Sequence, residues 1–373
     1  MVPNRVEATK TTADERSAGP ELRSLPLELI KVNKKLSSTF ELRELSLRVN
    51  AGEFFCLLGP SGSGKSTLLG LIGGWINPDC GRVVLGTTDY TGIPPFERPV
   101  RTCFQKAGFL FPHLTVAQNI GYALAVKGVS RTVIESRVKL LAQRVGLTGL
   151  ENRKPSQISG GEAQRVAIAR ALADPQPILL LDEIQTGLDR HLRSSIRNLL
   201  VDLTQDLHVT TLYVTHDATE ALGLASRLES RLGVLNKGQI VQIGTATEVY
   251  RSPRTSFVAN FIGDVNLLLI KHQEPNRFIT TGGTVLTIST RSDAHVRYVA
   301  IRPEAITLRN EGESMLLNGV VETIELLGPV ARIGVRVNND SVSLHSKSFD
   351  DLPTIGGRVN LYFSEKDLVI LAE

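Results

Sequence analysis

Residue types that hold phosphate groups occur together in one glycine-rich segment, Gly59-Pro60-Ser61-Gly62-Ser63-Gly64-Lys65-Ser66-Thr67. The segment fits the pattern G-x-x-x-x-G-K-[ST], whose glycines let backbone N–H groups converge on phosphate oxygens without a Cβ in the way. In this pattern Lys65 supplies a positive charge for the β- and γ-phosphates, and the Ser66 hydroxyl can ligate Mg²⁺. The segment therefore predicts a site for a nucleoside triphosphate and Mg²⁺. The alternative is a glycine-rich turn that binds nothing.

Two acidic residues could provide the metal and water chemistry that such a site needs. Asp182 and Glu183 follow the apolar run 178–181, and ligands meet an open α/β sheet at the carboxyl ends of its strands. One carboxylate can hold Mg²⁺ directly or through water, and the second can polarise the water that attacks the γ-phosphate. A solvated acidic turn is the alternative, but it is the weaker interpretation after four apolar residues and in a chain with a phosphate loop.

A second possible phosphate contact is the segment Ser159-Gly160-Gly161, which is followed by Glu162. Ser159 and Glu162 fit the S-x-x-E capping box, so the simplest interpretation is an ordinary helix start. The same helix start is an anion-binding end, able to meet a phosphate held by a second molecule. This stretch lies about twenty residues before Asp182 and strongly resembles the signature motif of ATP-binding-cassette (ABC) ATPases.

The resemblance implies roles for three further residues. Gln105 resembles the Q-loop glutamine, which couples Mg²⁺ and water to the membrane partner, and it is therefore expected among both the catalytic and the metal-binding residues. Asp189 resembles the D-loop residue that touches the opposite subunit beside the nucleotide. His216 resembles the switch histidine that contacts the γ-phosphate. With Glu183, these residues complete the set that the resemblance implies.

Longer segments make the resemblance more specific. Residues 108–116, 215–221 and 257–263 are similar to ATPase subunits of bacterial importers, and residues 301–304 are similar to their C-terminal TOBE domain. The group includes polyamine, ferric-iron, sulfate and sugar importers. It implies ATP and Mg²⁺ as cofactors, two ATPase subunits docked under two separate permease subunits, and a binding protein that delivers solute outside. The expected location is peripheral, on the cytoplasmic face of the inner membrane.

The fold class implied is α/β: a P-loop ABC cassette with a helical insert, followed by a small all-β, OB-like TOBE domain. We expect a flexible tail at 1–25, the cassette at 26–264 with its helical part at about 106–172, and the β domain at 265–373. Capping boxes beginning at Thr115 and Thr132 predict two helices in the insert, and Gly146 can end the second. An alternating pattern at 332–344, interrupted by Asn338-Asn339-Asp340, predicts a hairpin in the β domain.

Composition limits the class of protein further. A chain of 373 residues is long enough for two domains or more. Its formal net charge of +4 is small for this length and the basic residues are scattered, so no nucleic-acid partner is expected. No apolar run approaches the roughly 18 residues that cross a bilayer, and no secretory signal is visible. Three widely spaced cysteines favour reduced packing residues in a cytosolic protein.

Some positions depart from the family's usual form. The position of the usual adenine-stacking aromatic residue falls on Leu36, with Phe40 four residues later, so either Phe40 stacks on the base or the adenine contact is weaker. Ile184 stands where proline is common and Glu162 where glutamine is usual, while Gly73-Gly74-Trp75 replaces a small residue and a leucine. None of these departures removes a phosphate, metal or water ligand.

The implied mechanism is a dimer that closes around two ATP molecules. Each nucleotide would lie between Lys65, Asp182, Glu183 and His216 of one chain and the Ser159 segment of the other. Aromatic residues and His113 near Gln105 could form a groove for a permease helix, or some of them could be core of the insert. The segment 98–101 leans weakly towards a polyamine or ferric-iron solute.

Two other functions compete with this interpretation. A soluble ABC ATPase that acts on nucleic acid or the ribosome predicts tandem cassettes or a long coiled-coil insert, and the sequence has one cassette and neither feature. The C-terminal domain could also bind a small anion or the transported solute as a regulator, which is compatible with a transport motor.

Overall fold

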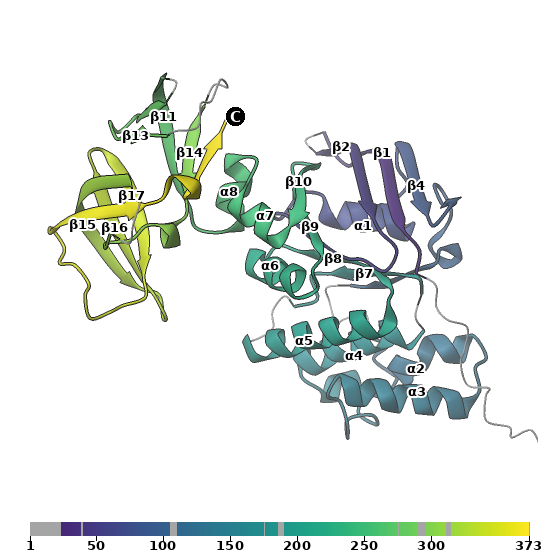
Figure 1. The fold of residues 1–373 in the computed structure, drawn as a ribbon. Coiled ribbons are helices and arrows are strands. Elements are labelled where there is room, and N and C mark those ends of the chain that lie inside the picture. The colour runs from purple at the N-terminus through teal and green to yellow at the C-terminus, as the bar shows by residue number, and fades with distance from the viewer. Residues whose placement is uncertain are drawn as a thin grey trace, which may run out of the picture.

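The structure, a computed structural model, describes residues 24–38, 40–104, 110–174, 176–185, 190–274, 276–288, 296–310 and 315–372. The predicted site residues Gln105 and Asp189 lie outside the described residues, as does the tail up to residue 23. Figure 1 shows an α/β body and a smaller all-β body, joined through the short helices α7 (Ala246–Arg251) and α8 (Ser256–Ile262).

The central element of the α/β body is a six-stranded sheet of order β10-β9-β3-β8-β7-β6. Its strands are β3 (Phe54–Leu58), β6 (Val100–Cys103), β7 (Ile178–Asp182), β8 (Thr210–Thr215), β9 (Arg231–Asn236) and β10 (Gln239–Thr245). All neighbouring pairs are parallel except the β9–β10 hairpin. β3 and β8 are buried at every residue and β7 at all but its last, as expected of central strands covered on both faces.

Each face of this sheet contributes to a separate core, because side chains alternate along a strand. Phe55 and Leu57 pack with helix α1 (Lys65–Gly73) and a small antiparallel sheet of order β2-β1-β4-β5. Its strands are β1 (Leu27–Lys35), β2 (Glu41–Val49), β4 (Cys80–Leu85) and β5 (Thr88–Asp89). Phe54, Cys56 and Leu58 face the opposite core, which is built with the remaining helices.

Those helices are α2 (Val116–Val126), α3 (Arg131–Arg144), α4 (Gly160–Ala173), α5 (Arg190–Leu207) and α6 (Ala218–Arg227). The capping box predicted at Thr115 is confirmed: Thr115 N donates to Gln118 Oε1 at 2.9 Å, and Gln118 N donates to Thr115 Oγ1 at 3.2 Å. The box predicted at Thr132 is wrong. Ile134 N already donates to Ser130 O at 3.1 Å, so Ser130 is the N-cap and Thr132 lies inside the first turn.

The two arginines of the segment 98–101, Arg98 and Arg101, have structural roles. Arg98 is 4% exposed and its Nη1 donates to the carbonyls of Leu71 and Ile72, both at 2.8 Å, near the C-terminus of α1. Its Nε donates to Ile93 O at 2.8 Å. Helix-end carbonyls need such partners because the helix itself supplies none. Arg101 pairs with Asp174, so both arginines of this segment serve the fold.

The all-β body contains two sheets around one core. The five-stranded sheet has the order β13-β12-β11-β14-β19, with β11 (Asn266–Glu274), β12 (Arg277–Thr280), β13 (Val285–Thr287), β14 (Tyr298–Ile301) and β19 (Leu368–Leu371). The four-stranded sheet has the order β17-β16-β15-β18, with β15 (Met315–Leu326), β16 (Ala331–Val337), β17 (Asp340–Ser346) and β18 (Arg358–Phe363). The predicted hairpin is confirmed as β16–β17, with its turn at Asn338-Asn339.

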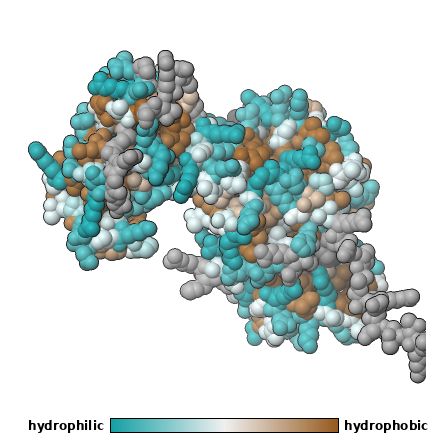
Figure 2. All heavy atoms as spheres, in the orientation of Figure 1, coloured by the Kyte–Doolittle hydropathy of each residue, from teal (hydrophilic) through white to brown (hydrophobic). Residues whose placement is uncertain are grey.

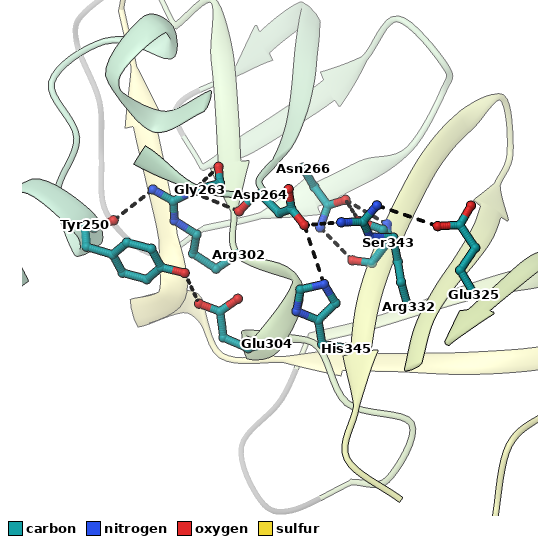
Figure 3. A network of polar contacts seen from close by, with 10 residues as sticks. All are labelled: Tyr250, Gly263, Asp264, Asn266, Arg302, Glu304, Glu325, Arg332, Ser343 and His345. Carbon is teal, nitrogen blue, oxygen red and sulfur yellow. Dashed lines mark hydrogen bonds and ion pairs between the residues drawn. The ribbon is translucent and has the colours of Figure 1, made fainter. Parts of the chain in front are cut away.

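The two bodies meet through a polar network that Figure 3 shows. Arg302 Nη1 donates to the carbonyls of Ala259, Gly263 and Asp264 at 2.9–3.0 Å, and Nη2 donates to Tyr250 O at 3.1 Å. The guanidinium also lies 4.3 Å from the centre of the Tyr250 ring. Arg302 follows β14, so one side chain of the β body binds the ends of both connecting helices.

The surface drawn in Figure 2 carries hydrophilic and hydrophobic residues intermixed over both bodies. Within the described ranges, no helix combines the length and apolar character needed to span a membrane.

Candidate active site

The phosphate loop lies between β3 and α1, as the sequence predicts. Gly62 and Gly64 have φ values of 79° and 110°, in the left-handed region that favours glycine. A Cβ at Gly64 would come within 2.9 Å of the Phe40 ring, and a Cβ at Gly59 would come within 2.6 Å of Ser63 Oγ. The loop therefore keeps its backbone N–H groups at the start of α1 in a shape that larger residues would disturb.

Lys65 lies inside this loop. Its side chain is 6% exposed, and Nζ donates to Gly59 O at 2.8 Å and to Pro60 O at 3.0 Å. Nζ also lies 3.5 Å from Glu183 Oε1. Burial lowers the pKa of Lys65, and the nearby carboxylates of Glu183 and Asp182 oppose that shift. The ammonium is thus held between the phosphate loop and the acidic end of β7.

Asp182 and Glu183 stand at that end in different environments. Burial, with a further contribution from Glu183, raises the pKa of Asp182 to about 6. Glu183 has a φ of 43° and its N donates to Val214 O at 2.9 Å, so the chain turns sharply here while staying bonded to β8. Its carboxylate lies between Lys65 Nζ and His216 Nδ1, which is 3.0 Å from Oε2. The structure therefore brings Lys65, Asp182, Glu183 and His216 together from three neighbouring elements.

These residues suit a magnesium nucleotide better than a metal held by protein alone. Among the described residues, no cluster of three or more His, Cys, Asp or Glu could hold a metal ion. Mg²⁺ usually keeps several waters and takes one or two protein ligands together with phosphate oxygens. The exposed Ser66 at the start of α1 and Asp182 at the end of β7 supply ligands of that kind.

The end of β8 holds the site together through a residue that the sequence analysis missed. Gly59 N donates to Thr215 O at 3.3 Å, and Thr215 Oγ1 donates to Glu220 Oε2 at 2.6 Å. The Tyr213 hydroxyl donates to the other oxygen of Glu220. Glu220 is only 7% exposed. Its place on the side of α6 that carries Ala221, Leu224 and Ala225 is the signal that could have indicated burial.

The Ser159 segment has the predicted capping box but lies apart from the phosphate loop. Ser159 N donates to Glu162 Oε2 at 2.6 Å, and Glu162 N donates to Ser159 Oγ at 3.3 Å. Ser159 and Gly160 are exposed at the start of α4. Over the part of the chain that the structure describes, no hydrogen bond or ion pair joins this helix start to residues 59–67.

A hollow of about 690 Å³ lies beside the phosphate loop. Phe40 lines it, together with Arg43, Lys237 and residues 60–63 of the loop, whereas Leu36 is not among its lining residues. Leu36 is 48% exposed. This arrangement favours Phe40 over Leu36 as the side chain that would contact an adenine base.

A second hollow, of about 290 Å³, lies between the sheet and the helical part. Its lining includes Phe104, Phe111 and Tyr122, and the Phe111 and Tyr122 ring centres are 4.4 Å apart. Phe104 and Tyr122 are 38% and 42% exposed, whereas Leu110 is buried in the core. Arg170 lies 5.6 Å from the centre of the Phe111 ring. The aromatic residues described here thus line the groove and Leu110 belongs to the core, while Phe109 lies outside the described residues.

Trp75 extends this aromatic surface from the end of α1. Its ring centre is 5.3 Å from that of Phe104, and its side chain is 43% exposed. The indole lies against the backbone of Gly73, where a Cβ would overlap the ring. The departure noted at Gly73-Gly74-Trp75 is therefore one structural unit, in which glycine makes room for the large ring.

The sequence is similar to known proteins along most of its length. Residues 42–186 match the family described as ABC transporter, and residues 299–371 match the TOBE domain. The spermidine/putrescine import ATP-binding protein PotA of Trichormus variabilis is 37% identical over 361 residues, covering 93% of each chain. The Fe(3+) ions import ATP-binding protein FbpC of Escherichia coli O157:H7 is 35% identical over 348 residues, covering 93% of this chain and 98% of the relative.

A solved structure resembles the α/β body. It is described as the dimeric post-hydrolysis state of an ATP-binding cassette bound to ADP and Pi. It is 32% identical, superimposes with a TM-score of 0.53, and covers 59% of this chain and 98% of its own.

Proposed function

The chain belongs to the ABC transporter family of ATP-binding proteins, and from that premise we propose that it is the motor subunit of an importer for a small solute. As a member of this family it binds ATP and hydrolyses it. The observation that carries the proposal is the meeting of Lys65, Glu183 and His216 beside the half-buried carboxyl of Asp182.

Each residue of this group has a chemical task. Backbone N–H groups of the loop and the Lys65 ammonium bind the phosphates, and Ser66 and Asp182 would hold Mg²⁺. When bound, Mg²⁺ neutralises charge on the β- and γ-phosphates. Glu183 accepts a hydrogen bond from the attacking water and orients it, while His216, in contact with the same carboxylate, faces the γ-phosphate. Gln105 is proposed to join the metal and water from the adjoining loop.

The Ser159 segment supports a site shared between two copies of the chain. An exposed helix start, whose N–H groups can bind an anion, has no bond to the phosphate loop of its own chain among the described residues. We infer that Ser159, Gly160 and Gly161 of one copy meet the γ-phosphate held by the other, with Asp189 beside that contact. Hydrolysis then removes the group that bridges the two copies.

The aromatic groove is the proposed contact for a permease. An exposed groove lined by Phe104, Phe111 and Tyr122 suits a short amphipathic helix, which would place apolar side chains between the rings. The protein would then sit on the cytoplasmic face of the inner membrane as a peripheral subunit. A solute-binding protein outside would reach it only through the permease.

The relatives support a polyamine or ferric iron as the solute. The two described above are named for spermidine/putrescine import and for Fe(3+) import, at nearly equal identity, so we propose this pair of solute classes without choosing between them. The domain limits that fit this assignment are 26–264 for the cassette and 265–373 for the β domain, with the boundary between α8 and β11.

Glu183→Gln tests the catalytic assignment. We expect ATP affinity within a few-fold of the parent and a loss of hydrolysis on the order of 100-fold or more, because the phosphate loop survives while water activation does not. Phosphate release and equilibrium binding of a fluorescent ATP analogue measure the two effects. Glu44→Gln is a matched control, since Glu44 has the same φ of 43° but lies exposed on β2. Turnover of Glu183→Gln within a few-fold of the parent would contradict the role of Glu183.

The same variant tests the shared site. With ATP bound and not hydrolysed, Glu183→Gln should form a dimer, which light scattering detects as a doubled mass. Replacing Gly160 by a bulky residue in that variant should abolish the dimer. A monomer at saturating ATP would count against the two-copy arrangement.

A further inference from the structure

Glu220 is an acidic residue in the core of the α/β body. It lies in the first turn of α6, is 7% exposed, and accepts hydrogen bonds from the hydroxyls of Tyr213 and Thr215 on β8. Burial raises its pKa, while those two hydroxyls and the charge of Arg197 oppose the shift and Asp217 adds to it. A carboxyl is costly to bury even when hydrogen-bonded, so packing alone gives no reason for it. An apolar residue would fill the same space.

The last two residues of β8 are bonded to two other parts of the site, the turn after β7 and the start of the phosphate loop. Val214 O accepts from Glu183 N at 2.9 Å, and Thr215 O accepts from Gly59 N at 3.3 Å. The next residue, His216, contacts the Glu183 carboxylate at 3.0 Å. A small shift of this strand end would therefore move the switch histidine, the water-activating carboxylate and the start of the phosphate loop relative to one another.

Glu220 closes the turn that follows this strand end. Thr215 Oγ1 donates to Glu220 Oε2 and accepts from Asp217 N at 3.1 Å. Asp217 Oδ1 in turn accepts from Glu220 N at 3.0 Å. His216 lies between Thr215 and Asp217, which are bonded to each other, so its backbone is fixed on both sides. Its side chain stays 47% exposed at the site.

We propose that Glu220 is a positioning residue for ATP hydrolysis: it clamps the end of β8 through Thr215, and so holds His216 and Glu183 in register with the phosphate loop. The proposal rests on the function proposed above for His216 and Glu183. Glu220 contacts β8, which His216 follows and to which Glu183 N is bonded, and it takes no part in binding the phosphates.

Glu220→Ala and Glu220→Gln test the clamp. The alanine variant should lower kcat on the order of 10- to 100-fold, since misplacing a catalytic group by about 1 Å has an effect of that size. Its Kd for ATP should stay within about threefold, because the loop and Lys65 keep their own bonds. Glutamine should restore most of kcat, because its amide oxygen accepts from one hydroxyl and its NH₂ donates to the other.

A matched control separates positioning from stability. Glu248 is likewise the third residue of its helix, α7, and its Oε2 accepts a hydrogen bond from Thr245 N at 2.8 Å, but it lies away from the site. Glu248→Ala should leave kcat unchanged. Glu220→Ala could lower Tm and still show the kcat of the parent when assayed at a temperature well below its own Tm. In that case the role of Glu220 is structural and the proposal is overturned. Should Glu220→Ala fail to fold, Thr215→Val removes the hydroxyl alone and must show the same selective loss of kcat.

His216→Ala, measured in parallel, distinguishes failure of this inference from failure of the proposed function. Parent-like turnover in His216→Ala would refute the assigned role of His216, and with it the reason for a clamp. Loss of turnover in His216→Ala with full turnover in Glu220→Ala would refute the clamp alone.

Discussion

Asp182→Asn tests the electrostatics of the site in the protein without nucleotide. Burial and the neighbouring Glu183 raise the pKa of Asp182 from 3.8 to about 6. A difference of about 2 pKa units between the folded and unfolded chain corresponds to about 3 kcal/mol. Ionising Asp182 is harder in the folded state than in the unfolded chain. The ionised carboxylate therefore destabilises the folded state by this free energy.

The sign fixes the pH window. Well below pH 3.8 the carboxyl is protonated in both states and contributes nothing. As the pH rises towards 6 the unfolded chain releases the proton first, and the folded state loses stability until the full effect is present near pH 7. Asparagine carries no charge at any of these pH values. The stability of Asp182→Asn relative to the parent should therefore rise by about 2.4 kcal/mol between pH 4 and pH 7.

Urea unfolding at half-unit pH steps measures this change. Trp75 is the only tryptophan of the chain and lies at the end of α1, so its fluorescence reports the α/β body alone. Any packing cost of asparagine is independent of pH and cancels from the slope. An unchanged m-value would show that both variants expose the same surface on unfolding.

Asp79→Asn is the control. Hydrogen bonds from Lys34 and from Lys35 N hold the pKa of this exposed carboxyl below its usual range, so its titration lies under pH 3.8. Its stability difference from the parent should be flat between pH 5 and pH 8. A flat or falling difference for Asp182→Asn over the same window would refute the burial argument for Asp182.

Two further predictions concern arginines that bind helix-end carbonyls. Arg98→Ala should destabilise the α/β body by about 3 kcal/mol in Trp75-monitored urea unfolding, because it leaves carbonyls at the end of α1 without partners and opens a cavity. A change under about 0.5 kcal/mol, the size of an ordinary surface substitution, would contradict that role. Arg302→Ala should speed protease cleavage between residues 251 and 265 while leaving ATP turnover within about twofold of the parent, because it removes the bonds to α7 and α8 but none in the site. Unchanged cleavage would contradict this role and show that the apolar contacts of the junction are enough to hold the two bodies together.

Local patterns predicted much of the fold. The phosphate loop, the strand β7, the capping boxes at Thr115 and Ser159 and the β16–β17 hairpin each depend on a few adjacent residues, so the sequence contains what decides them. The wrong start of α3 has the same origin: Ser130 and Thr132 are both acceptable caps, and the preceding turn decides between them.

Tertiary contacts decided the remainder. Glu220 in a helix and Arg98 in a turn have the composition of surface residues, and only the strands and helix ends packed against them make each a buried polar anchor. The choice between Phe40 and Leu36 depended on which side of the β1–β2 turn faces the phosphate loop. The proposed two-copy site depends on a second chain, so contacts within one chain do not decide it.

The contact between Gly73 and Trp75 makes the two positions depend on each other. A Cβ at residue 73 would overlap the indole where it now lies, so alanine at 73 requires the ring of Trp75 to move or to be replaced. The two substitutions should therefore be non-additive: Gly73→Ala should cost stability in the parent and much less in a chain that already carries Trp75→Leu.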